Sequence, residues 1–212
     1  MVKLCLLGED ERFGSGPSVH PPSPQRRLVL LYIMEAATRQ AVEDLQTAKD
    51  DEQKMVAAAK LDSACSQVLP EMPKLMEVTR SEEQKLLLVT HVFKLLAEDA
   101  AERGGQATIS KLDVRALCQS LRKTVETTTM LATMKYCADA FLALSRASHE
   151  ARTAFLQLAH SLHDCCKALL YSEPFGDGQS IEEARATMSR AVVLSNRGFD
   201  IFLGEQDLVR RM

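Results

Sequence analysis

The side-chain types best suited to chemistry gather in residues 160–166, which read His-Ser-Leu-His-Asp-Cys-Cys. On a helix, residues three and four positions apart share a face, so His160, His163 and Asp164 could reach a common point. Imidazole nitrogens and carboxylate oxygens are established ligands of zinc and similar ions. These three residues are therefore the candidate metal ligands of the chain.

The apolar residues around this patch favour a different orientation. They recur at helical spacing and predict a buried face that turns the two His and the Asp toward the flank. This predicted face consists of Ala151, Phe155, Leu158, Leu162, Cys165 and Leu169. A di-iron bundle would also need Glu-x-x-His pairs on two helices, and the sequence contains none. We expect no bound metal or cofactor, and keep a His160–Cys166 metal or cofactor site as the alternative.

Neighbouring thiols and other polar residues add no catalytic set. Of Cys165 and Cys166, only one can face the core, and the other is a candidate for oxidation. Residues 14–16 (Gly-Ser-Gly) lack the Lys and the helix that complete a phosphate-binding loop, and no Gly-x-Ser-x-Gly turn is present. His91 lies near Lys94 and Glu98 in sequence, which favours a solvated polar strip. We therefore predict no catalytic residues and no enzymatic activity.

The composition argues against a nucleic-acid-binding protein. The chain has 212 residues, a net charge of −3 and no Trp, whereas nucleic-acid binding needs a concentrated basic face and aromatic side chains that stack on bases. The apolar runs at residues 4–7 and 28–34 are too short to span a membrane. Six Cys within helical patterns favour buried free thiols over disulfides. These features predict a cytoplasmic protein without a transmembrane segment.

Helical periodicity predicts an all-α bundle of about seven helices. Apolar residues at helical spacing mark segments that begin near residues 26, 51, 81, 110, 131, 148 and 180. Capping boxes predict three of these starts, in which a Ser side chain and a Gln, Asp or Glu three residues later bind backbone N–H groups. The three pairs are Ser81 with Gln84, Ser110 with Asp113, and Ser180 with Glu183. Ser145 to Ser148 offers a further cap.

Helix-breaking residues predict the ends and the domain organisation. Pro70 and Pro73 end the second helix and leave Leu75 and Met76 in a linking segment. Gly104 and Gly105 stop the third helix, and the β-branched run 127–129 predicts a kink or break. The predicted organisation is a flexible arm (1–24), two helical halves (25–103 and 106–203), which could be three-helix units, and a tail (204–212).

Several short motifs resemble one known family. They are Tyr32 within residues 28–34, the helix that ends over residues 93–104, and Tyr136 with Ala138. An Ala-Glu-Asp (97–99) also runs into Glu-Arg-Gly-Gly (102–105) and then Thr108. Over residues 28–145 the chain thus resembles the N-terminal tandem-MIT domain of the ESCRT-III-associated regulator of the vacuolar-sorting AAA ATPase. The resemblance implies an adaptor whose helices bind amphipathic tails of ESCRT-III subunits, and it assigns no binding residues.

These observations together predict a non-enzymatic, all-α protein-interaction module or adaptor that could act in membrane trafficking. Its expected partners are amphipathic helices of other proteins, ESCRT-III subunits among them. The alternative is the metal- or cofactor-binding bundle described above. A third possibility is a self-associating scaffold that uses the apolar residues 199–203, which otherwise fold back onto the core.

Overall fold

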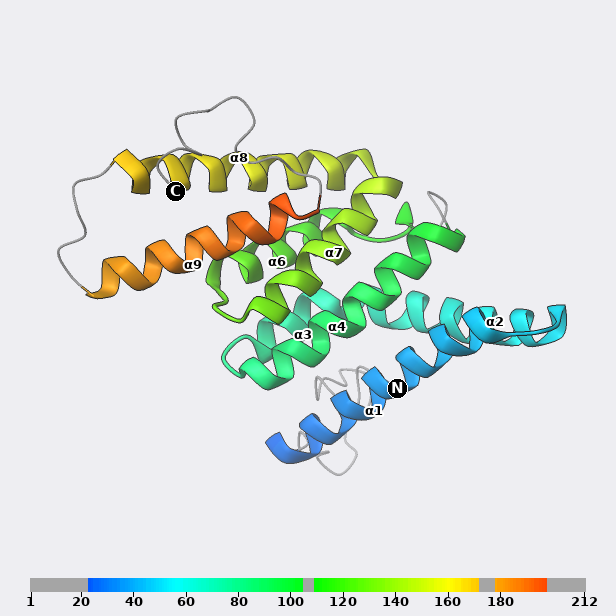
Figure 1. Ribbon diagram of the computed structural model, residues 1–212. Helices are drawn as coiled ribbons and strands as arrows, with labels where there is room; N and C mark the ends of the chain where they lie inside the picture. The colour runs from blue at the N-terminus through cyan, green and yellow to red at the C-terminus, as the bar shows by residue number, and fades with distance from the viewer. Residues whose placement is uncertain (1–22, 105–108, 172–177, 198–212) are drawn as a thin grey trace, which may run out of the picture.

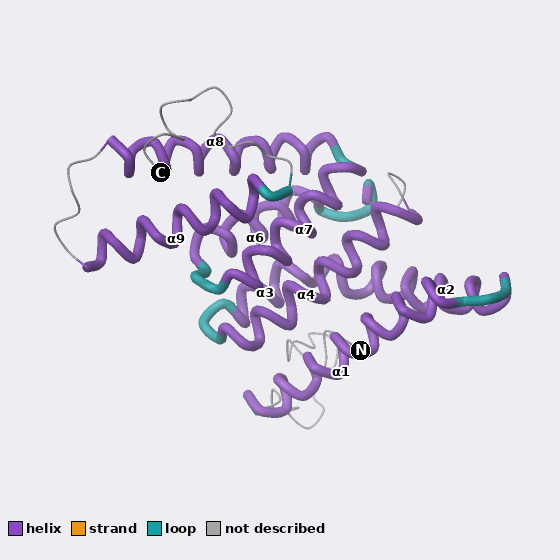
Figure 2. Tube along the Cα trace, in the orientation of Figure 1, coloured by secondary structure: helices purple, strands orange, loops and turns teal. Residues whose placement is uncertain are grey.

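All regular structure in the described part of the chain is helical (Figure 2). The computed structural model describes residues 23–104, 109–171 and 178–197. The expected all-α bundle is confirmed: each of the seven predicted helices is present, and one short helix is added. The helices within these residues are α1 (Pro24–Thr47), α2 (Asp51–Val68), α3 (Met72–Thr79), α4 (Glu83–Asp99), α6 (Val114–Thr127), α7 (Leu131–Ala147), α8 (His149–Tyr171) and α9 (Gly178–Ser195).

Helix α4 is buried around most of its circumference. Val89, Val92, Phe93 and Leu96 are fully buried, and they occupy two neighbouring stripes of the helix. A helix with so wide an apolar face needs cover from several sides. The cover comes from α1, α2, α3 and α7, all of which contact α4.

The remaining helices lie on the two sides of the α4–α7 pair (Figure 1). α1 and α2 form a hairpin that packs on α4, whereas α8 and α9 pack on α7 on the opposite side. One hydrophobic cluster runs from Leu31 in α1 to Leu194 in α9, so the two predicted halves contribute to a common core. The division into halves itself stays a prediction.

Short polar side chains cap several helices, and Ser148 lies in the stretch expected to supply a cap. Ser23, Asp50 and Ser148 each accept a hydrogen bond from the backbone N–H three residues further on, at 3.4, 2.7 and 3.3 Å. Each bond satisfies one of the N–H groups that the first turn leaves without an intrahelical partner. α1 begins at Pro24, one residue before the predicted start of the first helical half at residue 25.

The predicted capping box at Ser81 and Gln84 is wrong. α4 begins at Glu83, and its N-cap residue, Glu82, makes no capping hydrogen bond through its side chain. The Gln84 side chain instead donates to the Tyr32 hydroxyl at 2.8 Å, which links α4 to α1. A tertiary contact has therefore replaced the local one.

The other two capping boxes are also wrong in position. Asp113 is itself the N-cap of α6, which begins at Val114, and its side chain accepts from the Ala116 N–H at 3.0 Å. α9 begins at Gly178, which places Ser180 inside the helix. Asp caps a helix as well as Ser does, so sequence alone cannot choose between neighbouring candidates.

Residues 72–79 are a correction to the predicted linking segment. Pro70 and Pro73 do not leave an extended linker; they occupy the first turns of the 3-10 turn Leu69–Glu71 and of α3. A proline is tolerated there because the N–H that it lacks would have no intrahelical acceptor. Leu75 and Met76 are accordingly helical and buried.

The breaks predicted from β-branched residues and glycines agree better with the structure. α6 ends at Thr127 and α7 begins at Leu131, so the expected break is confirmed. The Thr128 hydroxyl accepts from the Met130 N–H at 3.2 Å and stabilises the turn. A π-helical turn, Ala100–Gly104, follows α4. Gly105 lies outside the described residues.

Some predictions fall on residues that the structure does not describe. These include residues 1–22 of the arm, the apolar residues 199–203 and the tail. Among the described helices, none is both long enough and apolar enough to cross a membrane.

We predict that Phe141→Ala will lower the free energy of unfolding by about 3–5 kcal/mol. Phe141 in α7 stacks on Phe155 in α8 with ring centroids 5.1 Å apart, and both rings are fully buried. Urea denaturation measures the loss. Leu131→Ala, at a position 49% exposed, is the matched control and should change stability by less than about 0.5 kcal/mol. Equal effects of the two substitutions would contradict this assignment of the core.

Candidate functional site

The structure does not assemble the predicted metal ligands into a site. His160 and Asp164 are exposed on α8, and His163 is half-buried. The His160 Nδ1–H donates to the Leu156 carbonyl of its own helix at 2.8 Å. Across the described residues, no three or more His, Cys, Asp or Glu side chains are grouped to hold a metal ion.

The predicted register of α8 is wrong at its C-terminal end. Cys165, expected in the core, is exposed, whereas Cys166 is buried. Four-residue steps from Leu158 through Leu162 to Cys166 keep the buried face on one side of the helix. Burial raises the pKa of the Cys166 thiol to about 11. Cys165 is the exposed member of the adjacent pair and is therefore the more accessible to oxidants.

The other described cysteines fit the expectation of buried free thiols. Cys65, Cys118 and Cys137 are buried and unpaired by disulfides. Burial raises the pKa of Cys65 and of Cys118 to about 12, and that of Cys137 further. Such thiols stay protonated and are poor nucleophiles.

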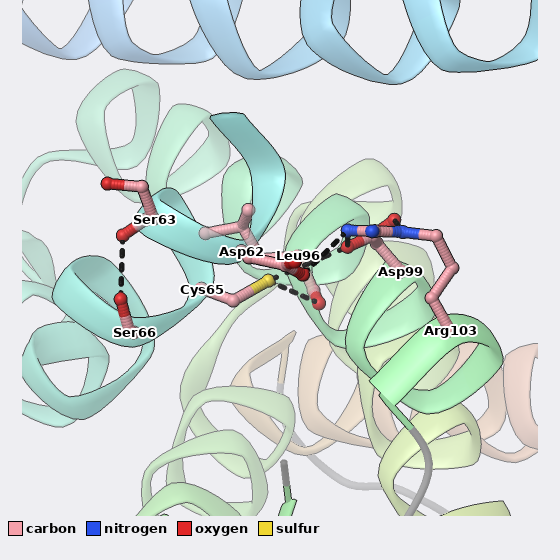
Figure 3. Close-up of polar contacts among 7 residues, drawn as sticks. All are labelled: Asp62, Ser63, Cys65, Ser66, Leu96, Asp99 and Arg103. Atoms are coloured by element: carbon pink, nitrogen blue, oxygen red, sulfur yellow. Dashed lines mark hydrogen bonds and ion pairs between the residues drawn. The ribbon is translucent and has the colours of Figure 1, made fainter. Parts of the chain in front are cut away.

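A polar junction joins α2 to the end of α4, and sequence reasoning did not find it (Figure 3). The Arg103 guanidinium contacts both carboxylate oxygens of Asp99 at 2.5 Å and Asp62 at 3.2 Å. The Cys65 thiol lies beside them and donates to the Leu96 carbonyl at 3.6 Å and to Asp99 at 3.7 Å. We call Asp62, Cys65, Asp99 and Arg103 the polar junction.

The polar junction holds helices together. The Asp99 side chain is 8% exposed, so its charge needs a partner, and Arg103 supplies two hydrogen bonds to it. The π-helical turn after α4 carries Arg103, whose guanidinium also reaches Asp62 in α2. The Asp99 carboxylate, in turn, raises the pKa of Arg103 through its hydrogen bonds.

A second polar contact corrects the prediction for His91. The His91 side chain is only 22% exposed: its Nδ1 lies 2.9 Å from a Glu35 carboxylate oxygen, and its ring stacks on Tyr136 at a centroid distance of 4.5 Å. Glu35 is in α1 and Tyr136 in α7, so His91 lies between the helices on either side of α4. Burial lowers the pKa of His91, and the Glu35 carboxylate opposes that shift. The sequence held no signal for this contact, since its residues are far apart in the chain.

Arginines tie α9 to the bundle in the same way. Arg197 binds both oxygens of the Asp139 carboxylate, at 2.5 and 2.9 Å. Arg190 donates to the backbone carbonyls of Val125 and Thr128 at 2.8 and 3.2 Å. Partial burial lowers the pKa of Arg190, while nearby carboxylates oppose the shift. These groups satisfy one another and leave no free catalytic pair among them.

The α1–α2 hairpin, by contrast, leaves large apolar side chains without cover. In α1, Val29, Tyr32 and Ile33 are 57%, 44% and 59% exposed. In α2, Met55 and Val56 are 70% and 53% exposed. Single exposed apolar residues are common on proteins, but groups of them on one element mark binding surfaces.

A groove of about 560 Å³ opens at the tip of this hairpin, where α1 ends and α2 begins. We call it the tip groove. Val56 and Ala57 give it an apolar part, and Asp44, Asp50 and Glu52 give it acidic edges. Lys60 lines it as well and lies 3.8 Å from Asp44. The groove therefore offers apolar contact beside negative charge.

A second groove, of about 500 Å³, lies between α6 and α8. Arg115, Arg122, His149 and Glu150 contribute charged or titratable groups to its walls. Arg122 is already paired with Glu126 at 2.7 Å. The mixed charges select no ligand class.

No protein-family model, no curated protein and no solved structure matches this chain. The tandem-MIT resemblance therefore stays a prediction.

We predict that Arg103→Met will destabilise the protein by about 2–4 kcal/mol, because it leaves the Asp99 carboxylate buried without its partner. The lower part of that range allows for the 25% exposure of the Arg103 side chain. Urea denaturation measures the loss. Adding Asp99→Leu to this variant removes the unpaired charge and should recover most of the lost stability. A single variant as stable as the wild type would contradict the role of the junction.

His91 should make stability depend on pH in a defined direction. Its folded-state pKa lies below the ordinary value of 6.5, so the unfolded chain binds the proton more readily. The contribution of neutral His91 to the free energy of unfolding is therefore complete above about pH 6.5, and it is lost as the pH falls through the folded-state pKa. At about pH 7.5, His91→Gln should cost about 0.5–1.5 kcal/mol through the lost stacking.

The measurement is urea denaturation of both proteins between about pH 7.5 and about pH 5.5. The difference in the free energy of unfolding between the wild type and His91→Gln should shrink as the pH falls. A difference that grows toward acid pH would show that His91 gains, rather than loses, stability on protonation.

Proposed function

We propose that the protein is a non-enzymatic, helical protein-interaction module that binds an amphipathic helix of a partner at the tip of its α1–α2 hairpin. The observation that carries the proposal is the exposure of Met55 and Val56, which are 70% and 53% exposed. Val56 lines the tip groove, and Met55 is its neighbour in α2. A flexible Met beside the apolar part of the tip groove suits the uptake of a partner's apolar side chains.

The electrostatics of the tip groove favour a basic partner. Asp44, Asp50 and Glu52 line it, and of these three only Asp44 has an ion-pair partner among the described residues, Lys60. The Asp50 carboxylate already accepts the Gln53 N–H as the helix cap, which leaves further acceptor capacity on its oxygens. A partner helix with one apolar stripe flanked by Lys or Arg matches this arrangement.

The polar clusters of the described residues support a non-enzymatic reading. The polar junction and the contacts of His91 and Arg197 each link two helices, and their groups are partnered. The alternative of a metal or cofactor on His160–Cys166 gains no support, because His160 binds its own helix and the candidate ligands form no group.

The resemblance to tandem-MIT domains suggests a more specific partner. If it reflects function, the bound helix is the C-terminal tail of an ESCRT-III subunit, and the protein is an adaptor in membrane trafficking within the cytoplasm. This finer proposal depends on the resemblance alone, whereas the helix-binding proposal depends on the hairpin.

The proposal is tested with fluorescent synthetic helices and the full chain. We expect a basic amphipathic helix, such as the tail of an ESCRT-III subunit, to bind, and an acidic helix with the same apolar stripe to bind at least about tenfold more weakly. Val56→Asp should reduce binding by about tenfold or more, because it places a charge in the apolar part of the tip groove. Fluorescence anisotropy gives the dissociation constants.

Leu156→Asp is the matched control, since Leu156 is 40% exposed in α8. α8 lies on the opposite side of the bundle from the α1–α2 hairpin (Figure 1). The Leu156→Asp variant should leave binding unchanged. No binding of any amphipathic helix, or equal losses in the two variants, would overturn the helix-binding proposal. Binding of other basic helices but not of ESCRT-III tails would overturn only the trafficking proposal.

A further inference from the structure

The outer face of α1 carries a regular row of exposed residues. Every described member of the row is exposed, whereas Leu31 and Thr38 on the opposite face are buried against the bundle. The spacing alternates between three and four residues, as along the contact seam of a coiled coil. We call this row the α1 outer stripe, and it consists of Arg26, Val29, Ile33, Ala36, Gln40 and Glu43.

The stripe is apolar in its middle and oppositely charged at its ends. Val29 and Ile33 are more than half exposed, and Ala36 is small enough to let another helix approach closely. Arg26 lies at the N-terminal end and Glu43 at the C-terminal end. Neither of these charged side chains has an ion-pair partner within residues 23–104, 109–171 and 178–197.

This order of residues is complementary to itself when reversed. In an antiparallel pair of α1 helices with the two-fold axis between Met34 and Glu35, Ile33 lies opposite Ala36 of the other copy. Val29 then lies opposite Gln40, and Arg26 opposite Glu43. A two-fold interface repeats every contact, so both ends gain an ion pair. A parallel pair would place Arg26 on Arg26 and Glu43 on Glu43, which repel.

We propose that the α1 outer stripe binds a second copy of this chain, antiparallel, to form a two-fold symmetric dimer. A seam of one helix is at the lower end of interface sizes, so the dimer dissociates in the micromolar range or above. Its surface is the outer side of α1, distinct from the tip groove. A dimer would therefore present two tip grooves, which strengthens binding to partners that carry several helices.

Sedimentation equilibrium of the full chain, from low to high micromolar concentration, tests the proposal. The wild type should shift from monomer to dimer mass. Ile33→Asp should remain monomeric, because two charges would be placed against the apolar centre. Arg26→Glu and Glu43→Arg should each weaken the dimer by about tenfold, since each creates two like-charge contacts. The double variant Arg26→Glu/Glu43→Arg should restore wild-type association, because both pairs are present again with exchanged signs.

Leu156→Asp on α8 is the control and should dimerise like the wild type. Circular dichroism checks the helical content of every variant, and restoration by the double variant excludes a folding defect as the cause of the single losses. A monomer at every concentration would overturn the proposal and would leave the stripe to another protein or to residues 1–22. A dimer that Ile33→Asp does not weaken, or single losses without restoration, would also overturn it. Helix binding at the tip groove is measured separately and can fail or succeed independently.

Discussion

The burial of α4 is the constraint on which the remaining architecture depends. Its fully buried residues, among them Val89, Phe93 and Leu96, occupy so much of the helix surface that a single neighbour cannot cover them. α7 covers one side, α3 another, and the α1–α2 hairpin the rest. Among the described residues, α1 packs on α4 and α2 through one side, and Val29 and Ile33 on its other side are 57% and 59% exposed.

Polar contacts then fix how the covering helices lie. Covering an apolar helix is non-directional, so it sets no unique register. Directional groups supply one at three boundaries: Arg103 with Asp62 between the end of α4 and α2, His91 with Glu35 between α4 and α1, and Arg197, just after α9, with Asp139 in α7.

Periodicity predicted the helices because apolar spacing reports burial directly. Capping was less predictable, since Asp113 and Ser110 are equally good candidates and only the fold selects between them. The linking segment predicted from Pro70 and Pro73 was wrong, because a proline can begin a helical turn as readily as it ends a helix. The predicted buried face of α8 was wrong by one residue at its C-terminal end, where Cys166 rather than Cys165 is buried. The environment of His91 could not be predicted, because Glu35 and Tyr136 reach it only through the packing of three helices.

The central claim is that the outward surfaces of the α1–α2 hairpin are where this protein meets other helices. Hydroxyl-radical footprinting reads the exposure of individual side chains and tests the claim directly. In the full chain at high concentration and saturated with a basic amphipathic helix, oxidation should fall at Ile33, Tyr32 and Met55 relative to the dilute free chain. Oxidation at Leu156 and Val192, which are 40% and 49% exposed on α8 and α9, should stay the same. Unchanged oxidation along the hairpin, or protection confined to α8 and α9, would contradict the account.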